Sequence, residues 1–264
     1  MEPYPLINIT PKDMKNITGL GLVISHTKTI ESFPGSTNVF NSNQPSLIVI
    51  YHNGCLAELK TKYGVGSFTP IGNKMYYSCY NEDENCYQIR SVSFDGTDTL
   101  IAGEFLEMGP FNRYKNTSYY IDTEKICFSK ICDIATFEDG CLIIEQNKGI
   151  VRLLKEDGSI EIKCAGFKNP KKLLANREGF YVTDILGVHI FNKEKQLFYL
   201  FEESRAKYNF GSTIYQLQNK VMLNNDSNDG ILVYDTEQKI IVNGLMSVRD
   251  FHGFGIGKSM KGFH

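Results

Sequence analysis

The chain has 264 residues and a mass of 29.9 kDa, enough for one large domain or two small ones with a substantial hydrophobic core. Apolar residues make up 42% and charged residues 22%, which excludes disordered, collagen-like and coiled-coil proteins. The net charge of -2 provides no whole-surface attraction to nucleic acids or acidic membranes, so any such contact must be local.

The apolar runs are far shorter than the roughly 18 residues of a membrane-spanning helix. Because Met1–Pro5 shows no targeting pattern, we expect a cytoplasmic protein without membrane or DNA contacts. Seven cysteines at irregular spacing, mostly in apolar segments, indicate reduced, buried thiols rather than a disulfide framework. Cys127 and Cys132 are expected in the core, and a hairpin could bring Cys79 opposite Cys86.

Short runs rich in Val, Ile, Tyr and Phe, separated by turn clusters, predict a fold that is nearly all β. Turns are predicted at Asn53-Gly54, Asp95-Gly96 and Glu156–Gly158. In chain order, the predicted groups of strands cover residues 47–59, 68–106, 132–164, 168–201 and 213–244.

Four strands repeated at intervals of about 40 residues are typical of a β-propeller, in which each blade buries its faces against its neighbours. The length predicts about six blades, with five or seven as alternatives. The propeller is expected to cover residues 1–256, closed by its terminal strands, and residues 257–264 to form an extended tail. Residues 1–45, which include Gly19–Ile24, are expected to supply strands that pair with the C-terminal segment, and residues 107–125 to form a long loop between blades.

Two segments resemble known propeller families. Residues 169–184, Asn-Pro-Lys-Lys-Leu-Leu-Ala-Asn-Arg-Glu-Gly-Phe-Tyr-Val-Thr-Asp, resemble an NHL repeat, and residues 73–103 are similar to blades of YWTD-type propellers. These resemblances imply a fold rather than a function.

Loops joining the second and third strands of each blade are expected at one mouth of the propeller. These loops, one of which contains His52-Asn53, carry Asn, Asp and Glu at several positions. Oxygen ligands of this kind suit Ca²⁺ or another hard divalent ion. Six-bladed lactonases use such ligands, and the corresponding candidates are Glu145, Asn176, Asp184 and Asn225. The simpler interpretation is that these residues form turns, because they bond their own backbone.

Other catalytic signatures are incomplete. The histidines are dispersed, without HxH or HExxH spacing, and there is no Gly-x-Ser-x-Gly motif. Gly253–Ser259 is similar to a phosphate-binding loop, but His252 stands where that motif needs a glycine.

The C-terminal segment 249–264 combines basic, aromatic and glycine residues, a composition that suits contact with phosphates and stacking on bases. The predicted contact residues are Arg249, Phe251, His252, Phe254, Lys258, Lys261, Phe263 and His264. The simpler alternative is a closing strand followed by a frayed end.

The sequence favours a non-catalytic, cofactor-free binding module that docks on a protein or ribonucleoprotein complex such as the ribosome. The fold and tail together resemble a ribosome-associated dormancy factor. A metal-dependent lactonase or esterase, with the ion at the central mouth, is the alternative. An RNA-binding NHL propeller is a third hypothesis, supported by the local basic patch Lys168–Arg177 but not by the overall charge.

Overall fold

The structure, a computed structural model, describes residues 11–17, 19–26, 45–108, 123–177, 179–185, 187–192, 197–198, 210–225, 230–235, 237–238 and 240–245. The regular elements in these ranges are β-strands, so the prediction of an all-β fold is confirmed. Within the same ranges no helix is long and apolar enough to cross a membrane. The chain divides into two compact units, Met1–Ala165 and Gly166–His264.

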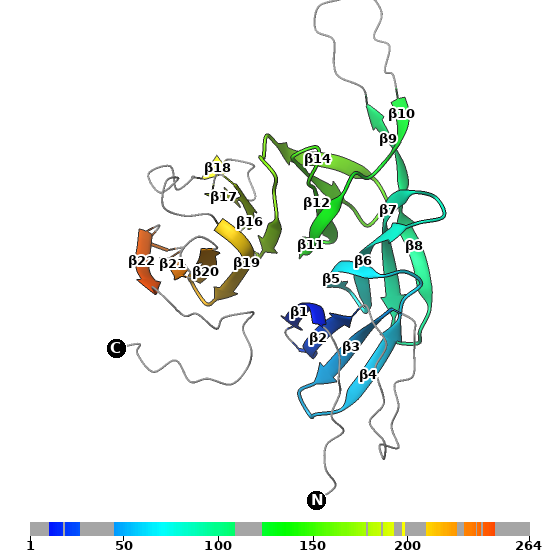
Figure 1. The fold of residues 1–264 in the computed structure, drawn as a ribbon, viewed down its shortest axis with the longest axis horizontal. Coiled ribbons are helices and arrows are strands. Elements are labelled where there is room, and N and C mark those ends of the chain that lie inside the picture. The colour runs from blue at the N-terminus through cyan, green and yellow to red at the C-terminus, as the bar shows by residue number, and fades with distance from the viewer. Residues whose placement is uncertain are drawn as a thin grey trace, which may run out of the picture. The chain divides into compact units, whose positions relative to one another are not determined.

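The described part of the first unit contains three four-stranded antiparallel sheets and one two-stranded sheet, each built from strands consecutive in sequence (Figure 1). The first sheet has β1 (Pro11–Ile17), β2 (Gly21–His26), β3 (Ser46–Tyr51) and β4 (Leu56–Lys60). The second has β5 (Val65–Ile71), β6 (Lys74–Asn81), β7 (Cys86–Ser93) and β8 (Asp98–Ala102). The third has β11 (Ile131–Phe137), β12 (Gly140–Glu145), β13 (Ile150–Leu154) and β14 (Ile160–Ala165). The two-stranded sheet has β9 (Glu104–Met108) and β10 (Thr123–Cys127).

The described part of the second unit contains two further four-stranded antiparallel sheets. The fourth sheet has β15 (Lys172–Ala175), β16 (Gly179–Asp184), β17 (Gly187–Asn192) and β18 (Leu197–Phe198). The fifth has β19 (Phe210–Leu217), β20 (Lys220–Asn225), β21 (Gly230–Asp235) and β22 (Ile240–Leu245).

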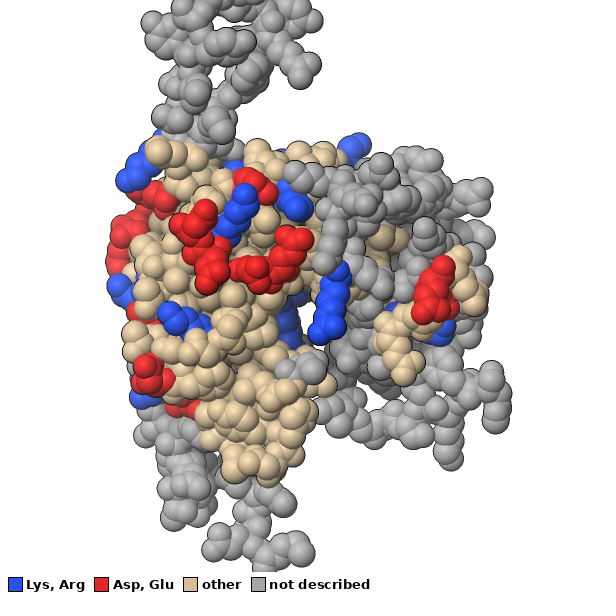
Figure 2. Space-filling view, turned by 180° about the vertical axis from the view of Figure 1, so that it is seen from behind, with Lys and Arg blue, Asp and Glu red and all other residues tan. Residues whose placement is uncertain are grey.

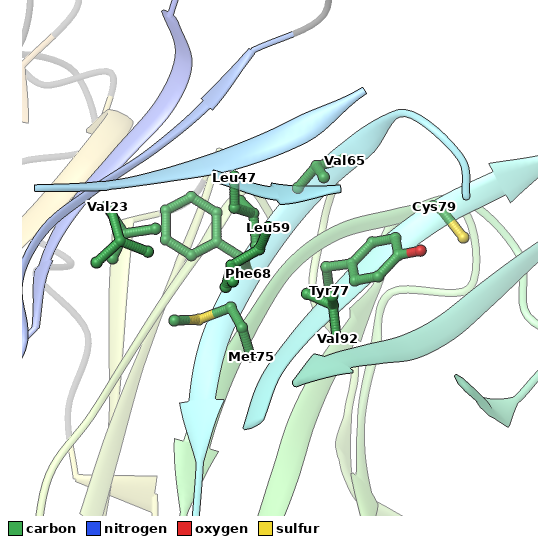
Figure 3. Close-up of a cluster of buried hydrophobic side chains, with 10 residues drawn as sticks. Val23, Leu47, Leu59, Val65, Phe68, Met75, Tyr77, Cys79 and Val92 are labelled. Atoms are coloured by element: carbon green, nitrogen blue, oxygen red, sulfur yellow. The ribbon is translucent and has the colours of Figure 1, made fainter. Parts of the chain in front are cut away.

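Neighbouring sheets bury their faces against each other, as propeller blades do. Figure 3 shows Val23, Leu47 and Leu59 of the first sheet beside Phe68 and Met75 of the second. A similar cluster joins the second sheet to the third, and another joins the fourth to the fifth. Because both faces of a blade are covered, its middle strands read as nearly continuous apolar runs, such as Cys141–Ile144.

Two predicted Asp-Gly turns are confirmed, and they use the same chemistry. Asp95 Oδ1 accepts a hydrogen bond from the Thr97 backbone N–H at 2.9 Å, and Asp157 Oδ1 accepts one from the Ser159 N–H at 2.8 Å. The glycine after each aspartate has a positive φ, 87° at Gly96 and 82° at Gly158, which a side chain would disfavour. The local sequence therefore determines these strand connections.

The first sheet corrects two sequence predictions. β2 pairs with β1 on one side and β3 on the other, so Gly19–Ile24 is not the strand that pairs with the C-terminal segment, and closure by another part of residues 1–45 stays a prediction. The sheet begins at Pro11 rather than near Leu47, and the His52-Asn53 turn therefore joins its third and fourth strands. The separation of β2 from β3 in the sequence concealed this arrangement.

The predicted loop at 107–125 begins and ends in strands, because β9 and β10 pair from Glu104↔Cys127 to Met108↔Thr123. Residues 109–122 lie outside the described residues. The described ranges contain five four-stranded sheets. Six blades, a single domain over 1–256 and a tail at 257–264 stay predictions.

Candidate functional site

The first strands of three consecutive sheets meet around the side chain of Lys15 on β1. Its Nζ donates hydrogen bonds to the carbonyl oxygens of Phe68 at 2.6 Å and Ile134 at 3.2 Å, and to Ser67 Oγ at 3.1 Å. Asp133 Oδ1 is 3.5 Å from the same nitrogen. One ammonium group thus joins β1, β5 and β11.

Irregular strand pairing occurs at two places beside the partners of Lys15. The pairing register shifts between Val65 and Phe68 in β5, and between Ile131 and Asp133 in β11. Irregularities of this kind, such as β-bulges, bend a strand and re-aim its side chains. Ser67 is thereby directed to Asp133, to which its hydroxyl donates a hydrogen bond.

The Lys15 cluster is suited to holding strands together. Ser67 and Asp133 are each 1% exposed, and the Ile134 N–H also donates to Asp133 Oδ1, at 3.0 Å. A buried carboxylate needs such donors, because burial without them is costly. The Lys15 side chain is 27% exposed, so the cluster is only partly closed to solvent.

A second set of polar groups lies where the second strand of a blade ends. Glu145, the last residue of β12, is fully buried and pairs with Arg152 on β13. Glu145 Oε2 also accepts a hydrogen bond from the Ser129 N–H at 2.6 Å. The carboxylate therefore ties the segment that enters the third sheet to the middle of that sheet.

The fourth sheet repeats this arrangement with other residues. Asp184 ends β16, and its Oδ2 lies 3.0 Å from His189 Nε2 on β17. The Lys168 N–H donates to Asp184 Oδ2 at 2.9 Å. His189 also packs edge-on against Phe167, with ring centroids 4.9 Å apart.

The residues predicted to bind a metal have individual roles in the structure. Glu145 and Asp184 contact Arg152 and His189, as described above. Asn176 Oδ1 accepts a hydrogen bond from the Gly179 N–H at 3.0 Å and so shapes a turn. Asn225 is the last residue of β20, and its side chain lies outside the description. Among the described residues no group of three or more His, Cys, Asp or Glu has the arrangement of a metal site. The metal site stays a prediction.

The eight predicted partner-binding residues between Arg249 and His264 lie outside the described residues. The cysteines are described, and no disulfide joins them. Burial raises the pKa of the Cys141 thiol to about 12, as expected for an unreactive core cysteine. Cys127 is exposed and Cys132 is half-buried, so the prediction that both lie in the core is wrong.

Cys79 and Cys86 do not face each other across the β6–β7 hairpin. Cys79 pairs with Gln88, and Cys86 pairs with Asn81. The register of that hairpin places the two cysteines at different levels of the sheet.

The two-stranded sheet of β9 and β10, here called the arm, departs from the repeating pattern. Its base is anchored where Phe105 packs against Phe128, with ring centroids 4.7 Å apart. The guanidinium of Arg152 lies over the Phe105 ring, 4.7 Å from its centroid. Leu106, next along β9, is 66% exposed. The arm, whose two strands project from the rest of the first unit in Figure 1, thus combines a fixed base with an exposed apolar side chain at Leu106.

A hollow of about 580 Å³ lies on the third sheet, between the β11–β12 and β13–β14 turns. Phe137 and Leu153 contribute apolar lining, and its charged residues are Glu138, Asp139, Lys155, Glu156 and Asp157. Figure 2 shows acidic side chains gathered on one face of the molecule, with a few basic ones among them.

No family model matches the chain, and no curated protein matches it. Solved structures are similar in fold. A protein of a nidogen/laminin complex shares 10% identity, with a TM-score of 0.52 over 85% of this chain and 76% of its own. Virginiamycin B lyase from Staphylococcus aureus shares 12%, with a TM-score of 0.54 over 90% and 84%. The WD40 β-propeller domain of Doa1 shares 8%, with a TM-score of 0.53 over 91% and 70%. At these identities the likeness shows the fold alone, which is a β-propeller.

Proposed function

We propose that this β-propeller is a non-catalytic binding module that docks on a larger assembly through the arm and the C-terminal segment. The exposed Leu106 on an anchored arm is the observation that supports this function. An apolar side chain held outward from a fixed base can enter a partner's surface at little cost in conformational entropy.

The buried polar groups support the same function. Asp133 lies 3.5 Å from Lys15 of the first sheet, Glu145 pairs with Arg152 of its own sheet, and Asp184 lies 3.0 Å from His189 of its own sheet. The charges of Asp133 and Glu145 are thereby used in holding strands together. Known propellers of similar fold include both binding proteins and lyases, so the fold itself does not decide between them.

We propose a ribonucleoprotein, such as the ribosome, as the partner. The acidic hollow on the third sheet disfavours broad contact between that face and RNA, because phosphates would meet carboxylates. Contact with RNA therefore falls to the basic segment 249–264, and the arm is left to contact protein.

Sedimentation of the native protein from cell lysate through sucrose tests this function. We expect co-migration with a large particle, and loss of co-migration in a chain lacking residues 257–264 and in Leu106→Ser. Leu100→Ser is the matched control, because Leu100 is also an exposed leucine, on the outer strand of the second sheet. Migration of the unaltered chain as a free 30 kDa species at low salt would overturn the proposal.

A metal-dependent hydrolase would sediment as a free protein and would respond to Ca²⁺. Ca²⁺ would raise the unfolding temperature, because an ion bound only to the folded state stabilises it. Glu145→Gln would abolish that rise. An ion-dependent rise together with free sedimentation would favour the hydrolase over the binding module.

A further inference from the structure

An asparagine followed by a glycine forms the turn between β3 and β4. Asn53 and Gly54 are both exposed. The Tyr51 N–H donates a hydrogen bond to the Cys55 carbonyl oxygen at 2.9 Å, and the Gly54 N–H donates to the Tyr51 carbonyl oxygen at 2.9 Å. Asn53 therefore lies in a tight turn that water reaches.

The turn holds the Asn53 side chain in place beside the next peptide bond. Asn53 Oδ1 accepts a hydrogen bond from the Cys55 backbone N–H at 3.0 Å. A donor at this position polarises the side-chain carbonyl and stabilises negative charge that develops on its oxygen, as an oxyanion hole does. Gly54 has a φ of 83°, and the space that a Cβ would fill there is open among the described residues. Nothing on Gly54 therefore hinders attack of its backbone nitrogen on Asn53 Cγ.

We propose that Asn53 is a modification site, at which the side-chain amide is hydrolysed through a cyclic imide formed with the backbone nitrogen of Gly54. A base removes the Gly54 N–H proton, the nitrogen attacks Asn53 Cγ, and Asn53 Nδ2 takes a proton and leaves as ammonia. Water then opens the imide. Cleavage of the bond from nitrogen to Cγ gives aspartate, whereas cleavage of the bond from nitrogen to the main-chain carbonyl carbon gives isoaspartate. One water is consumed and one ammonia is released, without oxidation or reduction.

Both products change the turn. Each introduces a carboxylate, which is ionised at neutral pH. In isoaspartate the main chain runs through Cγ and gains one carbon atom between Tyr51 and Cys55, so the hydrogen bond between these two residues no longer fits. The end of β4, the outer strand of the first sheet, then opens more readily. This inference concerns the chain alone and stands whether or not the arm binds a partner.

The chain contains a matched comparison. Asn243 is also followed by a glycine, but both residues lie within β22. Asn243 pairs with Val233 and Gly244 pairs with Leu232 on β21. An extended, paired main chain must open before the imide can form, so the same two residue types should react slowly there.

Incubation of the folded full-length chain at neutral and mildly alkaline pH, followed by tryptic peptide mapping with fragmentation, tests the proposal. Trypsin releases Asn53 in peptide 29–60 and Asn243 in peptide 240–249. We expect conversion at Asn53 to be about tenfold or more faster than at Asn243, because β22 must first open locally. The rate at Asn53 should rise with pH, since Gly54 attacks after losing its proton. In guanidinium chloride, which removes both turn and strand, the two rates should be similar.

Variants separate the reaction from its effect on the turn. Asn53→Gln should stay unmodified, because its longer side chain would have to close a larger ring. Asn73→Gln is the control, since it changes an exposed turn asparagine that no glycine follows, and it should leave conversion at Asn53 unchanged. Amide hydrogen exchange at Tyr51 should quicken in the isoaspartate form but not in Asn53→Asp. Equal rates at Asn53 and Asn243 in the folded chain, slower conversion of Asn53 in the folded than in the unfolded chain, or unchanged exchange at Tyr51 would overturn the proposal.

Discussion

Removing the cation of the buried Glu145–Arg152 pair should destabilise the protein strongly. The side chains of Arg152 and Glu145 are 2% and 0% exposed. In Arg152→Met an apolar side chain keeps the packing near Phe105 but no longer faces Glu145 with a charge. Loss of one partner from such a pair typically costs about 3–5 kcal/mol, because the other charge stays buried.

Two contacts of Glu145 moderate this cost. The Ser129 N–H still donates to Glu145 Oε2, and Lys148 Nζ lies 3.6 Å from the same oxygen, although Lys148 is 36% exposed. We therefore expect the lower limit, about 3 kcal/mol, which is a roughly 100-fold increase in the unfolding equilibrium constant. Urea unfolding at pH 7 measures the difference, provided that the free energy of unfolding falls with urea concentration at the same rate in both proteins.

Two controls test the reasoning. Lys155→Met removes the exposed Lys155–Glu161 pair, whose side chains are 46% and 41% exposed, and should leave the urea midpoint almost unchanged. Arg152→Met combined with Glu145→Gln should recover much of the lost stability, because no charge is then buried without its partner. A cost below about 1 kcal/mol for Arg152→Met, or a double variant no more stable than the single one, would refute the reasoning.

Three other changes have directions set by the structure. Burial raises the pKa values of Cys79 and Cys141 from the usual 9.0 to about 12, so these thiols lose their protons at lower pH in the unfolded chain than in the folded one. Their contribution to stability is fully present below about pH 9 and falls as the pH rises toward 12, which urea midpoints at pH 8 and pH 10 should show. Gly140→Ala should lower the thermal midpoint and Gly64→Ala should not, because a Cβ at Gly140 would lie 2.5 Å from the backbone oxygen of Leu154, whereas the space at Gly64 is open. Lys15→Met should cost about 1–3 kcal/mol in the same urea assay, since it removes the donor shared by three strands; an unchanged midpoint would contradict that role.

The strand groups were predictable because their signals are local. Each signal is contained in a short stretch of sequence, as in the apolar run Ile150–Leu154 and the turn Glu156–Gly158 that follows it. The Lys15 cluster was not predictable in this way. Lys15 is 52 residues from Ser67 and 118 from Asp133 in the sequence, so only the packing of three sheets brings them together.

Some signals were present but interpreted too simply. Arg152 stands within the apolar run Ile150–Leu154, and a charge there indicates a buried partner. The prediction of Glu145 as a loop ligand overlooks that it is the last residue of a buried strand. Pairing a charge inside one strand with a carboxylate at the end of the preceding strand would have suggested the ion pair.

The repetition of polar groups between blades bears on where binding residues should be sought. Glu145 pairs in register with Ile150, and its partner Arg152 lies two residues further along β13. Asp184 pairs with Gly187, and His189 again lies two residues further.

Each of these carboxylates also accepts a hydrogen bond from the backbone N–H of the segment entering its sheet. Because two separate sheets hold a buried carboxylate in the same way, this arrangement belongs to the structure of the blade and not to one binding function. Residues specific to one function should instead lie where the repetition is broken. In the described ranges the arm is such a place, because its two strands are inserted between the second and third sheets.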